Sequence, residues 1–194
     1  MGKFKKYTVS LLILLCLFTT YGFSQEGHFN RIYLEQMIIM GTSNITNFKL
    51  SFAEDDPAQN NDIVGVQGDN GMVFYIPVEY ITARNKFMLN DFRHLINAQD
   101  YPYIKLTIDD NQLEMLNNKL ITNRIKVKVT LSGMSKIYSI PFYKNCSGGN
   151  NSYITGNTNL NLSDFNIDSS KKIFGFVRLD DKVFINFKIN FSQS

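Results

Sequence analysis

The sequence predicts an all-β protein, a single antiparallel β-barrel with one short amphipathic helix. First, apolar and polar residues alternate in segments of strand length, most clearly in IKVKVTL (residues 125–131) and KVFINFKINF (residues 182–191). Because successive strand side chains point to opposite faces, each segment has one apolar face, expected to be buried, and one polar face, expected to be exposed to solvent. Second, turn-forming residues such as Asp69-Asn70-Gly71 separate the segments, and strands joined by tight turns pair antiparallel.

The same alternation marks ten candidate strands along the chain. They are residues 32–40, 47–53, 64–67, 72–80, 103–109, 124–131, 136–143, 153–162, 175–179 and 182–191. An open sheet with this many strands would leave exposed edges, so closure into a barrel is expected. We expect eight strands in the barrel, the size at which the interior is filled by side chains or holds one small ligand.

The exception to the strand pattern lies between residues 85 and 97. Apolar residues fall there at helical spacing, namely Met88 or Leu89, Phe92, and Leu95 or Ile96. Tyr101-Pro102 ends the segment, because a proline disfavours helix in the residue before it. This segment is expected to form a short helix that caps the sheet.

The N-terminal 24 residues have the pattern of a cleavable secretory signal peptide. Three lysines precede an apolar run over residues 9–18, and Gly22 and Ser24 are small residues before the expected cleavage at Gln25. The alternative, a membrane anchor, is disfavoured because the run is about half of the roughly 20 residues that span a bilayer. Cys16 is preceded by Leu15, which does not suit a lipoprotein signal. Residues 25–194 are therefore expected to form one exported domain.

The charge balance excludes one class of function. The full chain has 20 basic and 17 acidic residues, and cleavage removes three lysines and no acid, leaving 17 of each. A formally neutral protein gives no electrostatic reason to expect nucleic acid or an anionic membrane as a partner.

Residues suited to catalysis or metal binding are sparse. His28, His94 and Cys146 are widely separated and form no metal-ligand motif, so no metal is expected. Cys146 is the only cysteine after cleavage, so it has no intramolecular disulfide partner, and a homodimer through it or through a strand edge remains possible. No Gly-x-Ser-x-Gly motif occurs, and the acidic pairs are interpreted as loop tips, so an enzyme is not expected.

Several segments, taken in order, resemble the YceI-like family of bacterial exported proteins. The resembling segments are GTSNITNF (41–48), IPVEYIT (76–82), NDFRHL (90–95), YPYI (101–104), VTLSGMS (129–135) with Ile140-Pro141, and LSDFNI (162–167). They span roughly residues 32–191. Asn47 and Asn166 stand where the family has glycine.

The resemblance implies a lipocalin-like antiparallel β-barrel in the periplasm, with a long apolar tunnel for a polyisoprenoid chain, sometimes a quinone or an amphiphilic amide. It also implies no enzymatic activity and no cofactor beyond that bound lipid. Membrane contact would be peripheral or absent.

Two hypotheses follow for the interior. In the first, the apolar faces line a tunnel for a hydrophobic lipid. The expected tunnel residues are Phe48, Leu50, Phe74, Ile76, Ile104, Leu106, Val127, Val129, Ile140, Leu160, Ile185 and Phe187. In the second, the 16 phenylalanines of the chain fill the interior, and the barrel is a structural or interaction module of the cell envelope.

Overall fold

A computed structural model of the chain describes residues 31–52, 63–117, 123–147, 151–169 and 178–192. The expected signal peptide, His28 and most of the expected strand 175–179 lie outside these residues, as does the side chain of Cys146. Within the described ranges, no helix is both long enough and apolar enough to cross a membrane.

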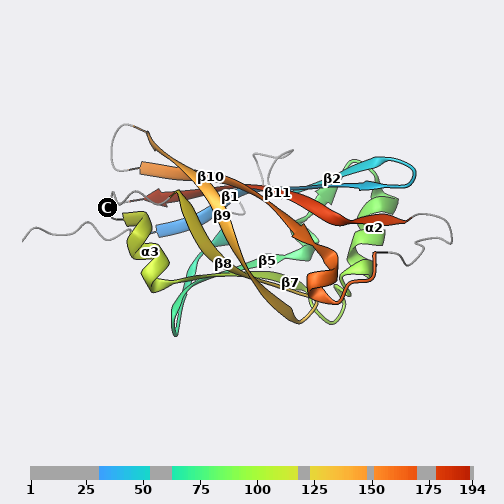
Figure 1. The fold of residues 1–194 in the computed structure, drawn as a ribbon, viewed down its shortest axis with the longest axis horizontal. Helices are drawn as coiled ribbons and strands as arrows, with labels where there is room; N and C mark the ends of the chain where they lie inside the picture. Colours follow the sequence, from blue (N-terminus) through green and yellow to red (C-terminus); the bar gives the residue numbers. More distant parts are fainter. Residues whose placement is uncertain (1–30, 53–62, 118–122, 148–150, 170–177, 193–194) are drawn as a thin grey trace, which may run out of the picture.

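The described chain folds into one antiparallel sheet of eleven strands, curled into a half-barrel (Figure 1). The strands are β1 (Arg31–Ser43), β2 (Asn47–Phe52), β3 (Ile63–Val64), β4 (Val66–Gly68), β5 (Gly71–Pro77), β6 (Thr82–Ala83), β7 (Tyr103–Asp109), β8 (Arg124–Leu131), β9 (Met134–Ser147), β10 (Asn151–Asn161) and β11 (Leu179–Ser192). Their order in the sheet is β4-β5-β7-β8-β9-β10-β11-β1-β2-β6, and β3 pairs with β1. The prediction of an antiparallel, mainly β fold is confirmed, but the expected closed barrel is a half-barrel, with β4 and β6 at the two ends of the sheet order.

The predicted count of eight strands is wrong, because several strands are too short to show alternation. β3, β4 and β6 have only two or three residues each. The expected strand 64–67 divides at Gly65, whose N–H donates to the carbonyl of Ile32 at 2.8 Å. The residues before Gly65 pair with β1 and those after it with β5, so this kinked segment links two strands that lie far apart in the sheet order.

The predicted helix is confirmed as α2 (Lys86–Leu95). Asn85 begins it, and its side-chain oxygen accepts hydrogen bonds from the N–H groups of Phe87 and Met88. This is the usual way in which a helix satisfies its first free N–H groups. Two short 3-10 turns, η2 (Val78–Tyr80) and η3 (Leu162–Phe165), complete the connections around the sheet.

A second helix, α3 (Asp110–Asn117), corrects the expectation of only one. Its sequence, DNQLEMLN, contains three Asp or Asn residues of low helix propensity, so local pattern gave little indication of it. Contacts with distant strands support the helix instead. The Gln112 Oε1 atom accepts from the N–H of Lys126 at 2.9 Å, and the Lys144 Nζ atom donates to the carbonyl of Leu116 at 2.8 Å. The two helices lie at opposite ends of the long axis in Figure 1.

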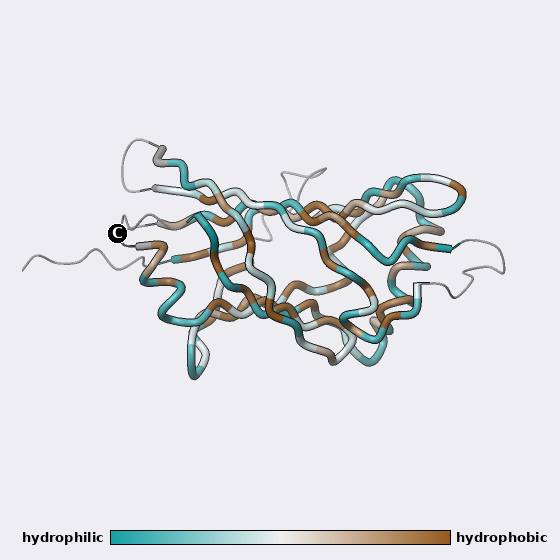
Figure 2. Tube along the Cα trace, in the orientation of Figure 1, coloured by the Kyte–Doolittle hydropathy of each residue, from teal (hydrophilic) through white to brown (hydrophobic). Residues whose placement is uncertain are grey.

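A β-bulge sets which residues of β1 face the interior. The pairing of β1 with β11 shifts between Leu34 and Gln36, so that Leu34 and then Met37 are buried. On the other side, Glu35 forms an ion pair with Lys188 at 2.8 Å. Figure 2 shows the resulting alternation of hydrophilic and hydrophobic residues along the strands.

Two tight turns have the backbone geometry that their residues allow. Ser132 and Gly133 both have positive φ and join β8 to β9, as a two-residue hairpin of the primed type requires. The Ser132 hydroxyl donates to the carbonyl of Ile96 at 2.7 Å, which ties this hairpin to the end of α2. Asn166 has φ of 57°, a left-handed conformation that asparagine tolerates better than most residues, at a position where the YceI-like pattern has glycine.

Candidate ligand-binding cavity

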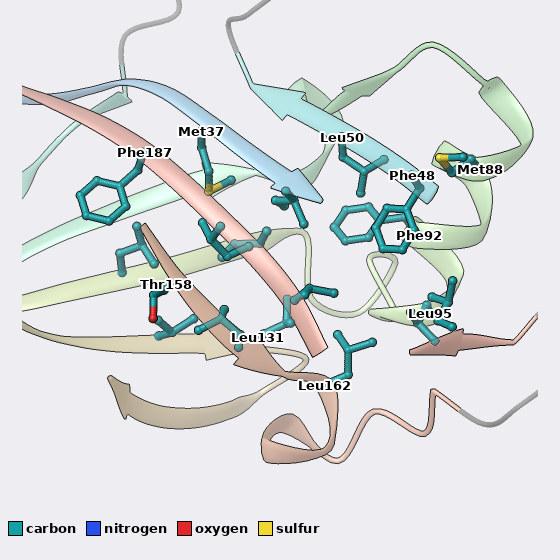
Figure 3. A pocket seen from close by; sticks show the side chains of 18 of the residues that line it. Met37, Phe48, Leu50, Met88, Phe92, Leu95, Leu131, Thr158, Leu162 and Phe187 are labelled. Atoms are coloured by element: carbon teal, nitrogen blue, oxygen red, sulfur yellow. The ribbon is translucent and has the colours of Figure 1, made fainter. Parts of the chain in front are cut away.

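An apolar cavity of about 310 Å³ lies inside the half-barrel (Figure 3). Of the strands in its wall, β11 and β8 contribute the most lining residues. These two strands contribute Ile125, Val127, Val129, Leu131, Leu179, Val183, Ile185, Phe187 and Ile189. They contain the segments 125–131 and 182–191 that showed the clearest alternation in the sequence, so the apolar faces of both strands do point to one shared space.

The cavity brings together eleven of the twelve residues expected to line a tunnel. They are Phe48, Leu50, Phe74, Ile104, Leu106, Val127, Val129, Ile140, Leu160, Ile185 and Phe187. Ile76 is not among the lining residues; it is fully buried in the hydrophobic core. Contact of any of these residues with a ligand stays a prediction.

Helix α2 supplies lining residues that were not assigned to the site from sequence. Phe87, Met88, Phe92 and Leu95 all line the cavity, and the last three are at the helical spacing that predicted an amphipathic helix. That spacing indicated an apolar face but not which surface the face covers. Figure 3 shows Met88, Phe92 and Leu95 on the helix side of the cavity, with the strands opposite.

The exposure of the lining residues distinguishes an open end from a closed end. Phe87 and Ile45 line the cavity and yet are 72% and 60% exposed, so the cavity reaches solvent where they lie. Ile108, Ile125 and Ile154 line it and are almost fully buried. The opening therefore lies between the turn that joins β1 to β2 and the N-terminal end of α2, and the opposite end is closed.

Two phenylalanine rings in the wall each lie over a glycine of the neighbouring strand. Gly41 pairs with Phe48 across β1 and β2, and Gly156 pairs with Phe187 across β10 and β11. A Cβ atom at Gly41 would come within 2.3 Å of the Phe48 ring, and one at Gly156 within 2.4 Å of the Phe187 ring. The absence of a side chain on each glycine thus leaves room for the far end of the ring to lie over the glycine backbone.

Polar groups are few in the lining and lie mainly near the opening. Ser43, Thr46, Asn85 and Asp91 line the cavity close to the β1–β2 turn and α2, and Thr158 contributes from β10. Burial raises the pKa of the Asp91 carboxyl, and the nearby His94 lowers it by a smaller amount. Among the described residues that line the cavity, Asp91 is the only acid and there is no lysine, arginine or histidine.

A separate polar cluster joins η3 to β9, outside the cavity. The Tyr138 hydroxyl donates to Asp164 at 2.7 Å, and the Lys136 Nζ atom lies 3.1 Å from the same carboxylate. These hydrogen bonds lower the pKa of Asp164, the one from Tyr138 having the largest effect. Burial, and secondly the hydrogen bond to Asp164, raises the pKa of Tyr138.

The lowered pKa of Asp164 predicts a loss of stability in acid. A carboxyl whose pKa is lower in the folded than in the unfolded state stabilises the fold above its ordinary pKa of 3.8, and this contribution is lost as the pH falls through the folded-state value. Asp164→Asn should therefore lower the urea midpoint at pH 7 and have a progressively smaller effect below about pH 4. Glu114→Gln, an exposed position on α3, is the control. An equal effect of Asp164→Asn at all pH values would contradict the assignment.

We expect metal ions to have no role in the fold. Among the residues that the structure describes, no group of three or more His, Cys, Asp or Glu side chains could hold an ion. A chelator should therefore leave the thermal unfolding midpoint unchanged. A downward shift of several degrees, reversed by adding back one metal, would show that a site had been missed.

The fold and the cavity define a class of protein: a small curled β-sheet that encloses an apolar space of ligand size, open at one end. The family model of the YceI-like domain matches residues 22–191. The chain therefore belongs to the YceI-like family, as the sequence segments indicated.

Three solved structures have the same fold. A polyisoprenoid binding domain from Saccharophagus degradans is 10% identical, with a TM-score of 0.59 over 84% of this chain and 98% of that one. BcnA from Burkholderia cenocepacia is 16% identical, with a TM-score of 0.52 over 79% and 95%. The YCEI protein of Campylobacter jejuni is 15% identical, with a TM-score of 0.50 over 92% and 95%. At these identities the likeness concerns the fold alone, and no curated protein matches the chain.

Proposed function

We propose that the protein binds one long apolar lipid chain of the polyisoprenoid class inside the cavity, as an exported carrier, store or scavenger in the periplasm. The observation that carries the proposal is the cavity itself, a ligand-sized space enclosed by aliphatic and aromatic side chains and open at one end. Its volume is at the lower end of the usual range for ligand pockets, roughly 300 to 1,000 Å³. Membership of the YceI-like family and the fold shared with a polyisoprenoid binding domain support the same proposal.

Apolar burial alone supplies enough free energy for binding. Each methylene that leaves water contributes roughly 0.8 kcal/mol, so about fifteen buried chain carbons contribute on the order of 12 kcal/mol before ordering costs. After the losses of translational and chain freedom, this leaves micromolar or better affinity. No catalytic group is needed, and none is part of the proposal.

The charges in the lining favour a neutral ligand. An anionic head group held inside the cavity would meet Asp91 and no cationic side chain among the described lining residues. Ser43, Thr46 and Asn85 offer hydrogen bonds to an uncharged polar end. We therefore expect a prenol or a quinone to bind more tightly than a prenyl phosphate of the same length.

Native mass spectrometry of protein purified gently from its own cells tests the proposal. We expect the mass of a chain that begins at or near Gln25, with an additional lipid mass that disappears under denaturing conditions. An uncleaved or acylated chain in the membrane fraction would contradict the exported soluble carrier. Protein without lipid that also takes up no added polyprenol would favour the alternative, a structural or interaction module.

A further inference from the structure

The opening of the cavity is surrounded by exposed apolar side chains. Ile45 is at the tip of the β1–β2 turn and Phe87 is in the first turn of α2, and both also line the cavity. In Figure 2 the β1–β2 turn is a hydrophobic tip that projects at the end of the molecule. We call this surface the rim. It consists of Ile45 and Phe87 together with Arg84, Lys86 and Arg178 beside them.

The charges of the rim are mainly positive. Arg84 and Lys86 are exposed immediately before Phe87 along the chain. Arg178 is exposed beside Ile45, because its backbone N–H donates to the Asn44 side chain at 2.7 Å.

Two acids, Asp91 and Asp180, lie near these three basic residues, so basic side chains outnumber acidic ones by one. Asp91 lines the cavity, and Asp180 accepts a hydrogen bond from the Thr42 hydroxyl. The N-terminus of α2, the positive end of its dipole, is also at the rim. Residues 25–194 are neutral overall, but this local excess of basic side chains and the helix dipole suit an anionic surface.

We propose that the rim docks onto a lipid bilayer that carries anionic head groups, so that the cavity opens directly onto the membrane. This inference rests on the proposed function, because the cargo would come from that membrane. Ile45 and Phe87 would insert into the boundary between head groups and acyl chains, while Arg84, Lys86 and Arg178 contact the head groups. Peripheral proteins commonly combine these two contributions, apolar insertion and basic contacts.

Docking in this orientation solves a physical problem for a lipid carrier. A long apolar chain that leaves a bilayer through water exposes all of its methylenes at once, each at a cost of transfer into water. With the rim against the bilayer, the lipid chain first passes Ile45 and Phe87. It then reaches Phe48 and Met88, which line the cavity behind them. The path from membrane to cavity is then lined mainly by apolar side chains.

Cosedimentation of the cleaved wild-type protein with vesicles gives the first test. We expect binding to vesicles of phosphatidylethanolamine and phosphatidylglycerol, and much weaker binding to phosphatidylcholine vesicles. Raising the ionic strength from about 0.1 M to about 1 M shortens the screening length from about 10 Å to about 3 Å and should release much of the bound protein. Wild-type protein that binds neither type of vesicle would overturn the proposal.

Matched variants test the apolar part of the rim. Ile45→Ser with Phe87→Ser should reduce the vesicle partition coefficient by about tenfold or more. The control is Ile137→Ser with Tyr143→Ser, whose side chains are 62% and 70% exposed on β9 but do not line the cavity. Equal partition of both variants, with circular dichroism showing both folded, would overturn docking through the rim.

Charge reversal separates docking from ligand binding. Arg84 and Lys86 do not line the cavity, so Arg84→Glu with Lys86→Glu should take up a short prenol from solution as the wild type does, while vesicle binding falls by about tenfold or more. The same reversal at Lys126 and Lys128, both exposed on β8, should leave both properties unchanged.

The remaining outcomes assign a failure to one of the two proposals. Prenol uptake by wild-type protein without vesicle binding would overturn docking and leave the proposed function in place. Vesicle binding without prenol uptake would overturn the proposed function, and with it the role of the rim in transfer. A wild-type dimer that the Ile45→Ser and Phe87→Ser changes dissociate, without any vesicle binding, would show that a second copy of the chain occupies the rim.

Discussion

Phe187→Trp is expected to weaken prenol uptake by roughly 5- to 150-fold, which corresponds to an overpacking cost of about 1 to 3 kcal/mol. Phe187 is buried in the cavity wall, and its ring already lies against Gly156, so a larger ring has room to extend only into the cavity. The chain contains no tryptophan, so the variant also introduces a single fluorescent reporter. Its emission should be at short wavelength and should change when prenol is added.

Ile137→Trp is the control for this reporter. Ile137 is 62% exposed on β9 and outside the cavity, so an indole there should emit as in water and not respond to prenol. Lys188, the next residue after Phe187, is a poorer control because it forms an ion pair with Glu35. If both tryptophan variants take up prenol equally and neither emission changes, the interior of the half-barrel is not the binding site.

Phe165→Ala is expected to destabilise the fold by about 3 to 5 kcal/mol. Phe165 is 1% exposed on η3, and its ring stacks on that of Tyr138 with centroids 6.2 Å apart. Removal of a ring from such a site leaves a cavity that the surrounding structure refills only in part. For a chain of this size, the thermal midpoint should fall by roughly 6 to 20 °C.

Because Phe165 does not line the cavity, prenol uptake by the folded Phe165→Ala protein should be unchanged at low temperature. Tyr143→Ala removes an aromatic ring that is 70% exposed and should change the stability by no more than about 0.5 kcal/mol. A loss below about 1 kcal/mol at Phe165 would mean that η3 does not pack against β9 as described.

The parts of the fold that the sequence predicted are those in which local pattern and tertiary packing agree. Alternation over seven residues in β8 leaves one choice of inward face, and the cavity wall uses that face. In β1 the run Met37-Ile38-Ile39-Met40 is apolar at every position, so alternation could not show that Met37 and Ile39 face inward. A bulge that depends on pairing with β11 decides it.

The features that the sequence did not predict depend on contacts between distant residues. Helix α3 is supported by Lys126 and Lys144, which follow it in the chain by many residues. The contribution of α2 to the cavity depends on where the helix lies relative to the sheet, and its periodicity carries no such information. The opening depends on two residues that are both exposed and part of the cavity lining, Ile45 and Phe87, and neither property follows from local sequence pattern.

The two wall glycines under phenylalanine rings have a consequence for how cargo preference can evolve. Any side chain at Gly41 or Gly156 would push the ring of Phe48 or Phe187 away from its strand and into the cavity. At Gly41 a single-codon change would thus narrow the space available to a ligand by moving a side chain alone, whereas at Gly156 the added Cβ would also lie 2.9 Å from the Pro141 carbonyl oxygen of β9. Gly41 is near the opening, so a mutation there would restrict which lipids can enter. Gly156 is deeper, so a mutation there would limit how far the lipid chain can extend into the cavity.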